Sequence, residues 1–406
     1  MDIKNTFRNG DLQEEVYMRQ PPEFVSQDMS LVCRLRKPIY GLKQAPRAWF
    51  KYLQDVILIT GFTQSKHDHS MFIHTTKHEI CFILLYVDDI FIFGNDFNSI
   101  KNVKVRLQEE FQMKDLGKVS YFVGLEISRS KRGIYIYQQK YALDLVSSAR
   151  LNDAKVVDIP MELNVKLSTH VGDPLLKPTM YRKLVGSLIY LTMTRPNIAY
   201  VVHVINQFFS DPLRPHLSAV YRILRYARGT SIRGLFFDST PSLDLSAYED
   251  ADWVGDLDTC HSTTRYCVFL GSSLISWKSK KHDIVYKSSI EAEYCVMSFV
   301  ASEIVWVRAL LNEFGIFISN PTPLYADDQS AIKITSNPVF HVRTKHINVD
   351  CHYVRDRYLD GTLFLLYVYS TMQTTDIFTK FVTRICHDFL MDKLMLYSCL
   401  HQLEGR

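Results

Sequence analysis

Residues 81–93 read Cys81-Phe-Ile-Leu-Leu-Tyr-Val-Asp88-Asp89-Ile-Phe-Ile-Phe93, so two carboxylates stand between two runs of strand-forming apolar residues. Aromatic and aliphatic side chains of this kind favour strands that are buried on both faces, and Asp-Asp is a plausible pair for a tight turn. The stretch therefore predicts a β-hairpin with the acidic pair at its tip.

Two adjacent carboxylates at a hairpin tip need a partner. Two unit charges ~4 Å apart repel by about 4 kcal/mol at an effective dielectric constant of about 20. Solvent, a cation or a shared proton must relieve that repulsion. The pair alone leaves two readings open, a solvated turn and a divalent metal site.

Length and composition describe a globular protein of several domains. The 406 residues are enough for two or three domains that each bury a core. Hydrophobic residues make up 47% and aromatic residues 13%, which argues against a disordered chain and offers rings for base stacking. The formal charge of +4 permits a nucleic-acid partner without requiring one.

The cysteines and the N-terminal residues bear on the compartment. Eight cysteines are scattered without a C-x-x-C pair or the histidine spacing of a zinc module, so we interpret them as reduced thiols. The first residues lack the apolar core of a signal peptide, and no uncharged apolar run reaches ~18 residues. We therefore expect a soluble protein that is not secreted and has no membrane partner.

The first half of the chain predicts an α+β unit followed by a helical region. Ala45-Pro-Arg-Ala-Trp-Phe50 opens an amphipathic helix ahead of the hairpin. After residue 116 come a pair of strands, a polar stretch at 152–178, and helices with apolar residues at three- and four-residue spacing. The strands are predicted at 121–127 and 133–137, and the helices at 181–191, 198–209 and 216–228.

The last of these helices carries Arg222, Arg225 and Arg228 on adjacent turns. A solvated helix face is one interpretation of this stripe. The other is a face that follows a phosphate backbone, because arginines at helical spacing suit the groove of a nucleic acid. The sequence leaves both open.

A third unit follows residues 229–243, whose glycine, proline and hydroxyl side chains have the turn chemistry of a hinge. Its apolar pattern alternates between strands and helices. The strands are predicted at 243–248, 264–270, 274–277 and 323–326, and the helices at 289–314, 329–336 and 341–357.

Four acids of this third unit stand where predicted elements begin or end. They are Asp250 after a strand, Glu291 in the first turn of a helix, Asp327 at a strand end, and Asp376 before Ile-Phe-Thr-Lys. Converging acids repel unless cations neutralise them, and two Mg²⁺ ions ~3.5–4 Å apart would clamp the attacking and leaving oxygens of a phosphodiester. Taken singly, each acid also has a structural reading as a turn residue or a helix N-terminal acid.

Short motifs follow one another in a fixed order along nearly all of the chain. They include Asp2-Ile-Lys, Tyr40-Gly-Leu-Lys-Gln-Ala-Pro-Arg-Ala-Trp49, Tyr86-Val-Asp-Asp89, Leu184-Val-Gly-Ser-Leu188, Asp250-Ala-Asp-Trp253, Ile275-Ser-Trp-Lys-Ser-Lys-Lys281, Glu291-Ala-Glu-Tyr294 and Asp376-Ile-Phe-Thr-Lys380. In this order they resemble the reverse transcriptase and ribonuclease H portion of a Ty1/copia-type retrotransposon Pol polyprotein.

The resemblance implies an α+β fold in which a reverse-transcriptase palm with partial fingers precedes a helical thumb and connection, followed by a ribonuclease H-like α/β domain. The implied domains are 1–118 for the palm and partial fingers, 119–235 for the thumb and connection, 240–385 for the ribonuclease H-like domain, and 386–406 for a C-terminal tail. By family the location is cytoplasmic, in a virus-like particle, or nuclear.

For the polymerase, the resemblance implies that Asp2 and Asp88 hold two Mg²⁺ ions and that Asp89 assists. Phe7 matches the ring that crowds the sugar 2′ position and favours deoxynucleotides. The segment beneath the incoming base and template contributes further residues to the expected nucleotide site. These residues are Tyr40, Gly41 and Lys43.

For the ribonuclease H, the resemblance implies catalytic and metal-binding roles for the four acids of the third unit. These are Asp250, Glu291, Asp327 and Asp376. Each active site would take two Mg²⁺ ions, with Mn²⁺ as a substitute. The implied partners are an RNA template, a DNA primer, their hybrid and deoxynucleoside triphosphates, and no oligomeric state is predicted.

The sequence begins one residue before Asp2, which matches the first polymerase aspartate. In the family, the sequence upstream of this aspartate supplies most of the fingers. We therefore expect an N-terminally truncated polymerase. The alternative is a catalytically silent retrotransposon relic that at most binds nucleic acid.

Overall fold

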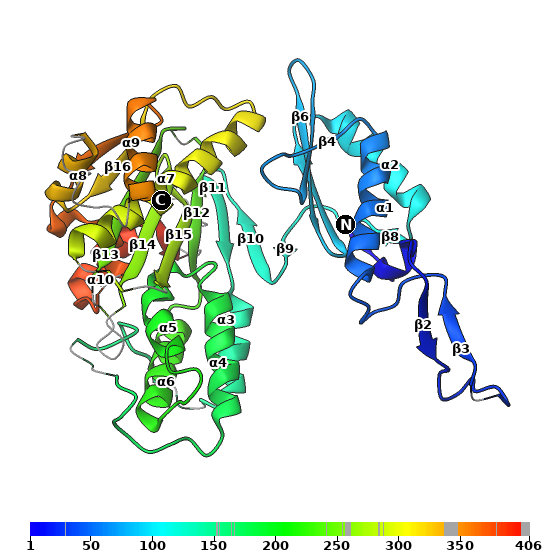
Figure 1. The fold of residues 1–406 in the computed structure, drawn as a ribbon, viewed down its shortest axis with the longest axis horizontal. Coiled ribbons are helices and arrows are strands. Elements are labelled where there is room, and N and C mark those ends of the chain that lie inside the picture. Colours follow the sequence, from blue (N-terminus) through cyan, green and yellow to red (C-terminus); the bar gives the residue numbers. More distant parts are fainter. Residues whose placement is uncertain are drawn as a thin grey trace. The chain divides into compact units, whose positions relative to one another are not determined.

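The computed structural model divides the chain into two compact units, Met1–Val123 and Gly124–Arg406 (Figure 1). It describes residues 1–398 apart from 29, 152, 154, 164, 166, 241, 254, 256–260, 283, 284, 287, 337–347 and 379. Both units combine helices with β-sheet. The predicted domain boundaries at 118, 235 and 385 remain a prediction.

Unit 1 is a six-stranded sheet with two helices on one face (Figure 1). The strand order is β4-β5-β6-β7-β1-β8. The bounds are β1 Asp2–Ile3, β4 Thr63–Gln64, β5 Met71–Thr75, β6 Ile80–Tyr86, β7 Asp89–Gly94, β8 Met113–Lys114, α1 Ala45–Ile59 and α2 Phe97–Glu110. A short helix η1 (Thr6–Asn9) and a separate ribbon of β2 (Val16–Arg19) and β3 (Val32–Leu35) complete the unit, which ends at β9 (Tyr121–Phe122).

Local chemistry explains where the two helices begin. Pro46 lies in the first turn of α1, where its missing N–H removes no helical hydrogen bond. The Asp96 carboxylate caps α2 by accepting a hydrogen bond of 2.8 Å from the Ser99 N–H. Trp49 and Leu53 of α1 pack with Leu107 of α2 against the sheet and form the core of the unit.

The predicted hairpin is confirmed, but the predicted turn is wrong. Tyr86 pairs with Asp89, so the two-residue turn is Val87-Asp88 and Asp89 already belongs to β7. The expectation that both strands are buried on both faces is also wrong for β7, where only Ile90 is buried. The strand register, which the local composition does not specify, decides both differences.

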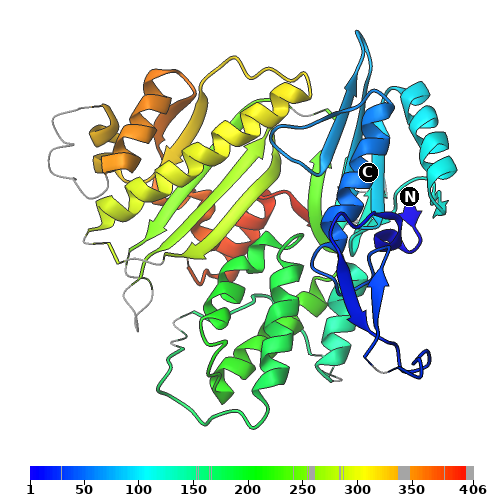
Figure 2. The same ribbon diagram turned by 45° about the vertical axis from the view of Figure 1, so that its right-hand side comes forward.

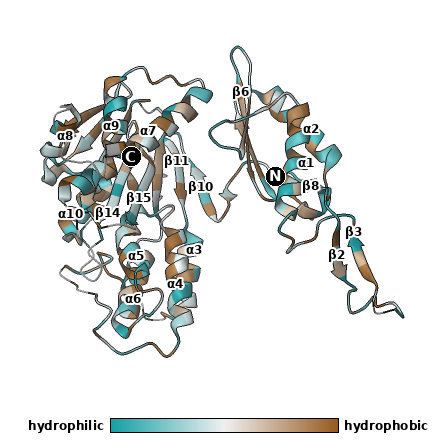
Figure 3. Cartoon of the chain, viewed as in Figure 1, coloured by the Kyte–Doolittle hydropathy of each residue, from teal (hydrophilic) through white to brown (hydrophobic). Residues whose placement is uncertain are grey.

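Unit 2 begins with an antiparallel sheet and a group of helices. The sheet joins β10, β11, β12 and β18, and buried apolar residues of α3, α4, α5 and α6 form one cluster. The bounds are β10 Leu125–Arg129, β11 Gly133–Tyr137, β12 Arg233–Asp238, β18 Leu396–Ser398, α3 Gln139–Ser148, α4 Pro178–Leu191, η2 Pro196–Ile198, α5 Ala199–Asn206 and α6 Arg214–Gly229. Both brown and teal residues occur along α4 and α6, as their amphipathic patterns predict (Figure 3).

The predicted helices of this region are confirmed, and two other expectations are wrong. The strand predicted at 121–127 is broken, because Val123 and Gly124 have φ values of 47° and 75°, outside the extended range. The segment predicted as a hinge at 229–243 contains β12, which pairs with β11 and β18. Residues 386–398 of the expected tail lie in α10 (Arg384–Lys393) and β18.

The arginine stripe of α6 matches neither of its two interpretations. Arg222 forms an ion pair of 2.7 Å with Glu162, and Arg225 forms one of 2.9 Å with Asp153. Arg228 donates hydrogen bonds to the carbonyl oxygens of Leu151 and Asp153. The three arginines therefore attach the polar stretch after α3 to α6.

The second sheet of unit 2 has the order β15-β14-β13-β16-β17, and α7 runs along one of its faces (Figure 2). Strands β13, β14 and β15 are antiparallel, whereas β16 and β17 run parallel to β13. The bounds are β13 Leu245–Asp252, β14 Thr263–Leu270, β15 Ser273–Lys281, β16 Thr322–Ala326, β17 Leu363–Tyr367 and α7 Ser289–Glu313. These elements confirm the predicted strands and the predicted long helix.

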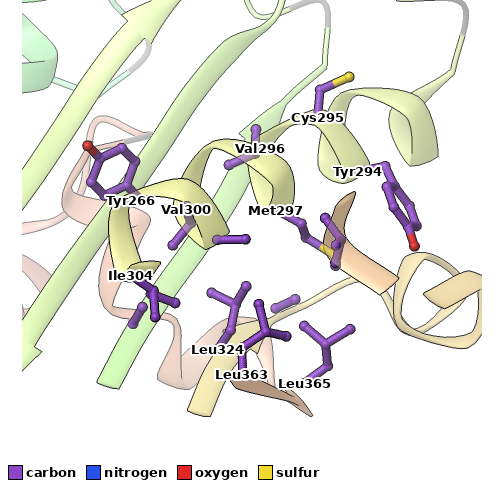
Figure 4. Packing of buried hydrophobic residues seen from close by; sticks show 14 of the residues in the cluster. Tyr266, Tyr294, Cys295, Val296, Met297, Val300, Ile304, Leu324, Leu363 and Leu365 are labelled. Carbon is purple, nitrogen blue, oxygen red and sulfur yellow. The ribbon is translucent and has the colours of Figure 1, made fainter. Parts of the chain in front are cut away.

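Helix α7 is the core helix of this layer. Val300 and Ile304 lie over Leu324 and Leu363 of the sheet (Figure 4). By length and composition alone α7 could cross a membrane, but half of its most apolar stretch is buried inside the chain. A helix that is apolar around much of its circumference is typical of a protein core.

The remaining elements complete the second layer. They are α8 Gln329–Ser336, α9 Asn348–Leu359, η5 Ser370–Met372, η6 Thr374–Phe378 and α10. The prediction of α8 is confirmed. Of the helix predicted at 341–357, the part before residue 348 lies outside the described residues, and the rest is α9.

Candidate catalytic sites

Strand β1 places Asp2 directly opposite Asp89. It lies between β7 and β8, so Asp2 is in the interior of the sheet. The Ile3 N–H donates to the Asp88 carbonyl at 3.1 Å, and the Ile90 N–H donates to the Met1 carbonyl at 2.9 Å. These bonds flank the Asp2–Asp89 pair and make it a non-hydrogen-bonded pair, in which Cα atoms come within about 4.5 Å.

The two aspartates share the sheet face that the helices leave uncovered. Their neighbours Ile3 and Ile90 are buried in the core with α1, and successive side chains on a strand point to opposite faces. Asp88 is exposed in the adjoining turn. The Trp49 ring nitrogen donates a hydrogen bond of 2.7 Å to the Val87 carbonyl and holds that turn. The register thus places Asp2 and Asp89 side by side, with Asp88 in the adjoining turn, and their joint role as a metal site stays a prediction.

The electrostatics of this group favour a cation. Burial, and then the charges of Asp88 and Asp2, raise the pKa of Asp89 above its ordinary value. Like charges directly opposite each other on a sheet are destabilising. Asp2, Asp88 and Asp89 supply carboxylate oxygens, which are the ligands that Mg²⁺ takes.

The predicted nucleotide-contacting residues lie partly together. Phe7 and Tyr40 form an edge-to-face pair with ring centroids 4.9 Å apart. Gly41 has a φ of 93°, which favours glycine, and a Cβ there would meet no atom within 4 Å. Lys43 is exposed and lines a cavity of about 690 Å³ together with Arg47.

In unit 2, three carboxylates from three elements converge. Asp250 comes from β13, Glu293 from α7, and Asp327 directly follows β16. Each offers an oxygen, and these oxygens lie within 4.8 Å of one another. Asp250 and Asp327, two of the four acids expected to converge, lie together here because β13 and β16 are adjacent parallel strands.

The predicted Glu291 is not part of this group, and Glu293 takes its place. Two residues along an α-helix are about 200° apart around its axis, so only one of the two glutamates faces the sheet end. The Glu293 carboxylate also accepts a hydrogen bond of 3.2 Å from the Ala251 N–H of β13. The Glu291 N–H instead donates to the Ser288 hydroxyl at the helix N-cap.

Asp376 lies near the group without joining it. Its carboxylate, on η6, accepts a hydrogen bond of 2.9 Å from the Lys380 ammonium. Burial lowers the pKa of Lys380, but the neighbouring acids raise it by more. The pKa of Lys380 is therefore above its ordinary value. Lys380 thus supplies positive charge to Asp250 and Asp327 as well.

Burial dominates the ionisation of this cluster. It raises the pKa of Asp250 to about 6, and it raises the pKa of Asp327. Burial, and then the charges of neighbouring acids, hold the pKa values of Glu249 and Glu293 well above normal. Both oxygens of Glu249 and Oε2 of Glu293 have no hydrogen-bond partner among the described residues.

The unsatisfied Oε2 of Glu293, together with the Asp250 and Asp327 carboxylates, fits a divalent cation. Buried charges are stable only when paired or bound to metal, and the cluster offers hard oxygen ligands. Sequence reasoning missed Glu293, Glu249 and Arg265, whose guanidinium lies beside Asp250. The spacing Glu291-Ala-Glu293 contained the signal for the first, since either glutamate could face the sheet.

Comparisons with known proteins identify the family. A family model described as "Reverse transcriptase (RNA-dependent DNA polymerase)" matches residues 1–163. The "Retrovirus-related Pol polyprotein from transposon RE1" of Arabidopsis thaliana is 42% identical over 395 residues, which are 97% of this chain and 27% of that protein. The "Putative transposon Ty5-1 protein" of Saccharomyces cerevisiae is 33% identical over 309 residues, 75% of this chain and 100% of that protein. This chain belongs to the Ty1/copia-type retrotransposon Pol family.

The Ty1/copia relatives extend well beyond the matched region. The protein from transposon TNT 1-94 of Nicotiana tabacum is 35% identical over 395 residues, 95% of this chain and 30% of that protein. The chain thus spans about a quarter of the length of its first curated relatives, 27% and 26%. The reverse transcriptase match accords with the acids on β1 and β7, because this family works on a nucleic-acid template and primer and typically uses divalent metals.

Proposed function

We propose that this Ty1/copia chain is an RNA-directed DNA polymerase that also has ribonuclease H activity. The observation that carries the polymerase proposal is the direct opposition of Asp2 and Asp89 across β1 and β7, with Asp88 in the next turn. Three acids on the uncovered sheet face and its adjoining turn are costly for stability alone, and they suit the chemistry of phosphoryl transfer.

The three acids would hold two Mg²⁺ ions, which supply activation of a primer hydroxyl and neutralise charge on the departing pyrophosphate. The chain's own residues would position the reactants. Phe7, kept in place by the Tyr40 ring, would crowd the 2′ position of an incoming deoxynucleotide. Gly41, whose φ of 93° favours glycine, would lie beneath the template base, and Lys43 would add positive charge for the triphosphate.

The second activity rests on the convergence of Asp250, Glu293 and Asp327. We propose that residues 240–385 form a ribonuclease H-like domain, with 119–235 as thumb and connection. The cluster would hold Mg²⁺, with Mn²⁺ as substitute, and cleave the RNA strand of an RNA–DNA hybrid. Asp376 and Lys380 would keep the local charge balanced at the edge of the site. A cytoplasmic or nuclear location remains a prediction.

Primer extension tests the polymerase. With a poly(rA) template, an oligo(dT) primer and Mg²⁺, the wild-type chain should incorporate dTTP, and Asp88→Asn should abolish incorporation because it removes a metal ligand. Asp68→Asn, a turn residue of the same unit that binds Ser70, is the matched control and should retain activity. Equal incorporation by the wild type and Asp88→Asn would overturn the assignment.

The alternative, a silent relic that binds nucleic acid, predicts a different result. Hybrid binding that weakens with salt would persist without any extension or cleavage. Extension that requires Mg²⁺ would exclude it.

A further inference from the structure

Arg265 is a buried guanidinium inside the acid cluster of unit 2. The register of β13 and β14 sets it directly opposite Asp250, so both side chains lie on the same face. Its side chain is 1% exposed. Nη2 lies 2.9 Å from Oδ2 of Asp252, and Nη1 lies 3.9 Å from Oδ2 of Asp250.

The surroundings of Arg265 hold it in this position. Its Cζ lies 4.9 Å from the centroid of the Tyr200 ring, within the range of a cation–π contact. Nε and Nη1 have no hydrogen-bond partner among the described residues. The attraction between the guanidinium and the acids therefore holds Arg265 in place, since its hydrogen-bond donors are only partly satisfied.

The charges of the cluster explain why such a group is tolerated. Asp250, Glu293 and Asp327 converge, and Asp252 and Asp376 lie beside them. Two fixed cations already face these acids, Arg265 on Asp250 and Asp252, and Lys380 on Asp376. A second divalent ion between Asp250 and Asp252, where the Arg265 guanidinium lies, would meet a fixed positive charge, which repels it strongly in a buried site.

We propose that Arg265 is a resident counter-cation that takes the place of a second divalent ion, so that this cluster binds one divalent cation per chain. The proposal rests on the metal-binding role of the cluster in the proposed ribonuclease H. It assigns Arg265 a positioning role, since it acts on Asp250 and Asp252 and touches no reacting atom. It also revises the expectation of two ions at this site.

Counting bound Mn²⁺ tests this inference. In the full chain carrying Asp2→Asn, Asp88→Asn and Asp89→Asn, the cluster of unit 2 is the one converging group of three acids among the described residues. Electron paramagnetic resonance of free Mn²⁺ gives the number bound. We expect one Mn²⁺ per chain in this background. Adding Arg265→Gln should admit a second ion or tighten the first about tenfold or more.

Two further variants serve as controls. Arg265→Lys keeps the charge and should leave the count at one. Arg308→Gln, which removes an arginine bound to backbone carbonyls elsewhere in unit 2, should also leave it unchanged. Near-ultraviolet circular dichroism of each variant checks that the fold is retained.

The outcomes separate this inference from the proposed function. Two Mn²⁺ ions with Arg265 in place, or an unchanged count and affinity in folded Arg265→Gln, would overturn the role of Arg265 while the metal site stands. No bound Mn²⁺ in any variant, Arg265→Gln included, would overturn the proposed metal site itself. If Arg265→Gln does not fold, the number of Mn²⁺ ions bound by the parent background and by Arg265→Lys still tests the proposal. One ion supports the role of Arg265, and two ions contradict it.

Discussion

At the scale of single residues, burial sets how the acids of unit 2 behave. Asp250 is 8% exposed, and burial raises its pKa to about 6, although Arg265 opposes the shift. A carboxyl group with a raised pKa in the folded state stabilises the fold at low pH, and that stabilisation is lost as the pH rises through the folded pKa.

The pH dependence of stability checks this shift. In metal-free buffer, the free energy of unfolding should fall as the pH rises from about 4 to about 7, because ionised Asp250 is disfavoured in the folded chain. A shift of about two units corresponds to about 3 kcal/mol. Asp250→Asn should reduce the fall by about 2 kcal/mol in urea unfolding at pH 4.5 and 7.5, because the rest of the change lies below pH 4.5.

The matched control is Asp211→Asn, at an exposed acid of the same unit. Its pH dependence should follow the wild type. Equal falls in the wild type and Asp250→Asn would show that Asp250 titrates normally.

At the scale of elements, the turn between β6 and β7 carries strain. Val87 has a φ of 55°, a left-handed conformation that costs an L-residue about 1–2 kcal/mol. Val87→Gly should therefore stabilise the chain by about 0.5–1 kcal/mol, since glycine adopts this conformation without a steric penalty but loses more chain entropy on folding. Urea unfolding measures the change.

Val105→Gly, on the exposed side of α2, is the comparison. There glycine should destabilise by about 0.5 kcal/mol, because helix geometry suits valine better. Destabilisation at both positions would contradict a strained turn.

The arginine stripe of α6 leads to a second prediction about elements. Arg225→Gln breaks the ion pair with Asp153, in which both side chains are about two-thirds buried, and should cost about 1 kcal/mol or less of stability. Because these arginines bind the chain's own acids, the salt dependence of hybrid binding should not change. A slope of log K against log salt that becomes shallower by about 0.9 would instead indicate a lost phosphate contact.

At the scale of the whole molecule, the sequence predicts what local periodicity controls. The apolar spacing was sufficient to find α4, α7, β13 and β16, and the strand ends pointed to Asp250 and Asp327, but the pairing of β13 with β16 that joins these acids was not predicted. Contacts between residues far apart in the sequence could not be predicted. Neither the pairing of Arg225 with Asp153 nor the register that puts Asp89 opposite Asp2 can be derived from local pattern.

The choice between two glutamates shows the same limit. Glu291 and Glu293 occupy the same helical turn, and only the rotation of α7 on its sheet selects Glu293. Helix rotation depends on the packing of Val300, Ile304 and their neighbours against the strands. A periodic pattern gives the buried stripe of a helix only to within about one residue position.

The most direct test of the unit 2 site is Mg²⁺-dependent cleavage of an RNA–DNA hybrid by two matched variants, Glu293→Gln and Glu291→Gln. Each replaces one buried glutamate in the first turns of α7 with its neutral isostere. We predict that Glu293→Gln lowers the cleavage rate about a hundredfold or more, because it removes a ligand oxygen from the cluster. Glu291→Gln should stay within about threefold of the wild type. Loss of cleavage in Glu291→Gln with full activity in Glu293→Gln would contradict the site described here.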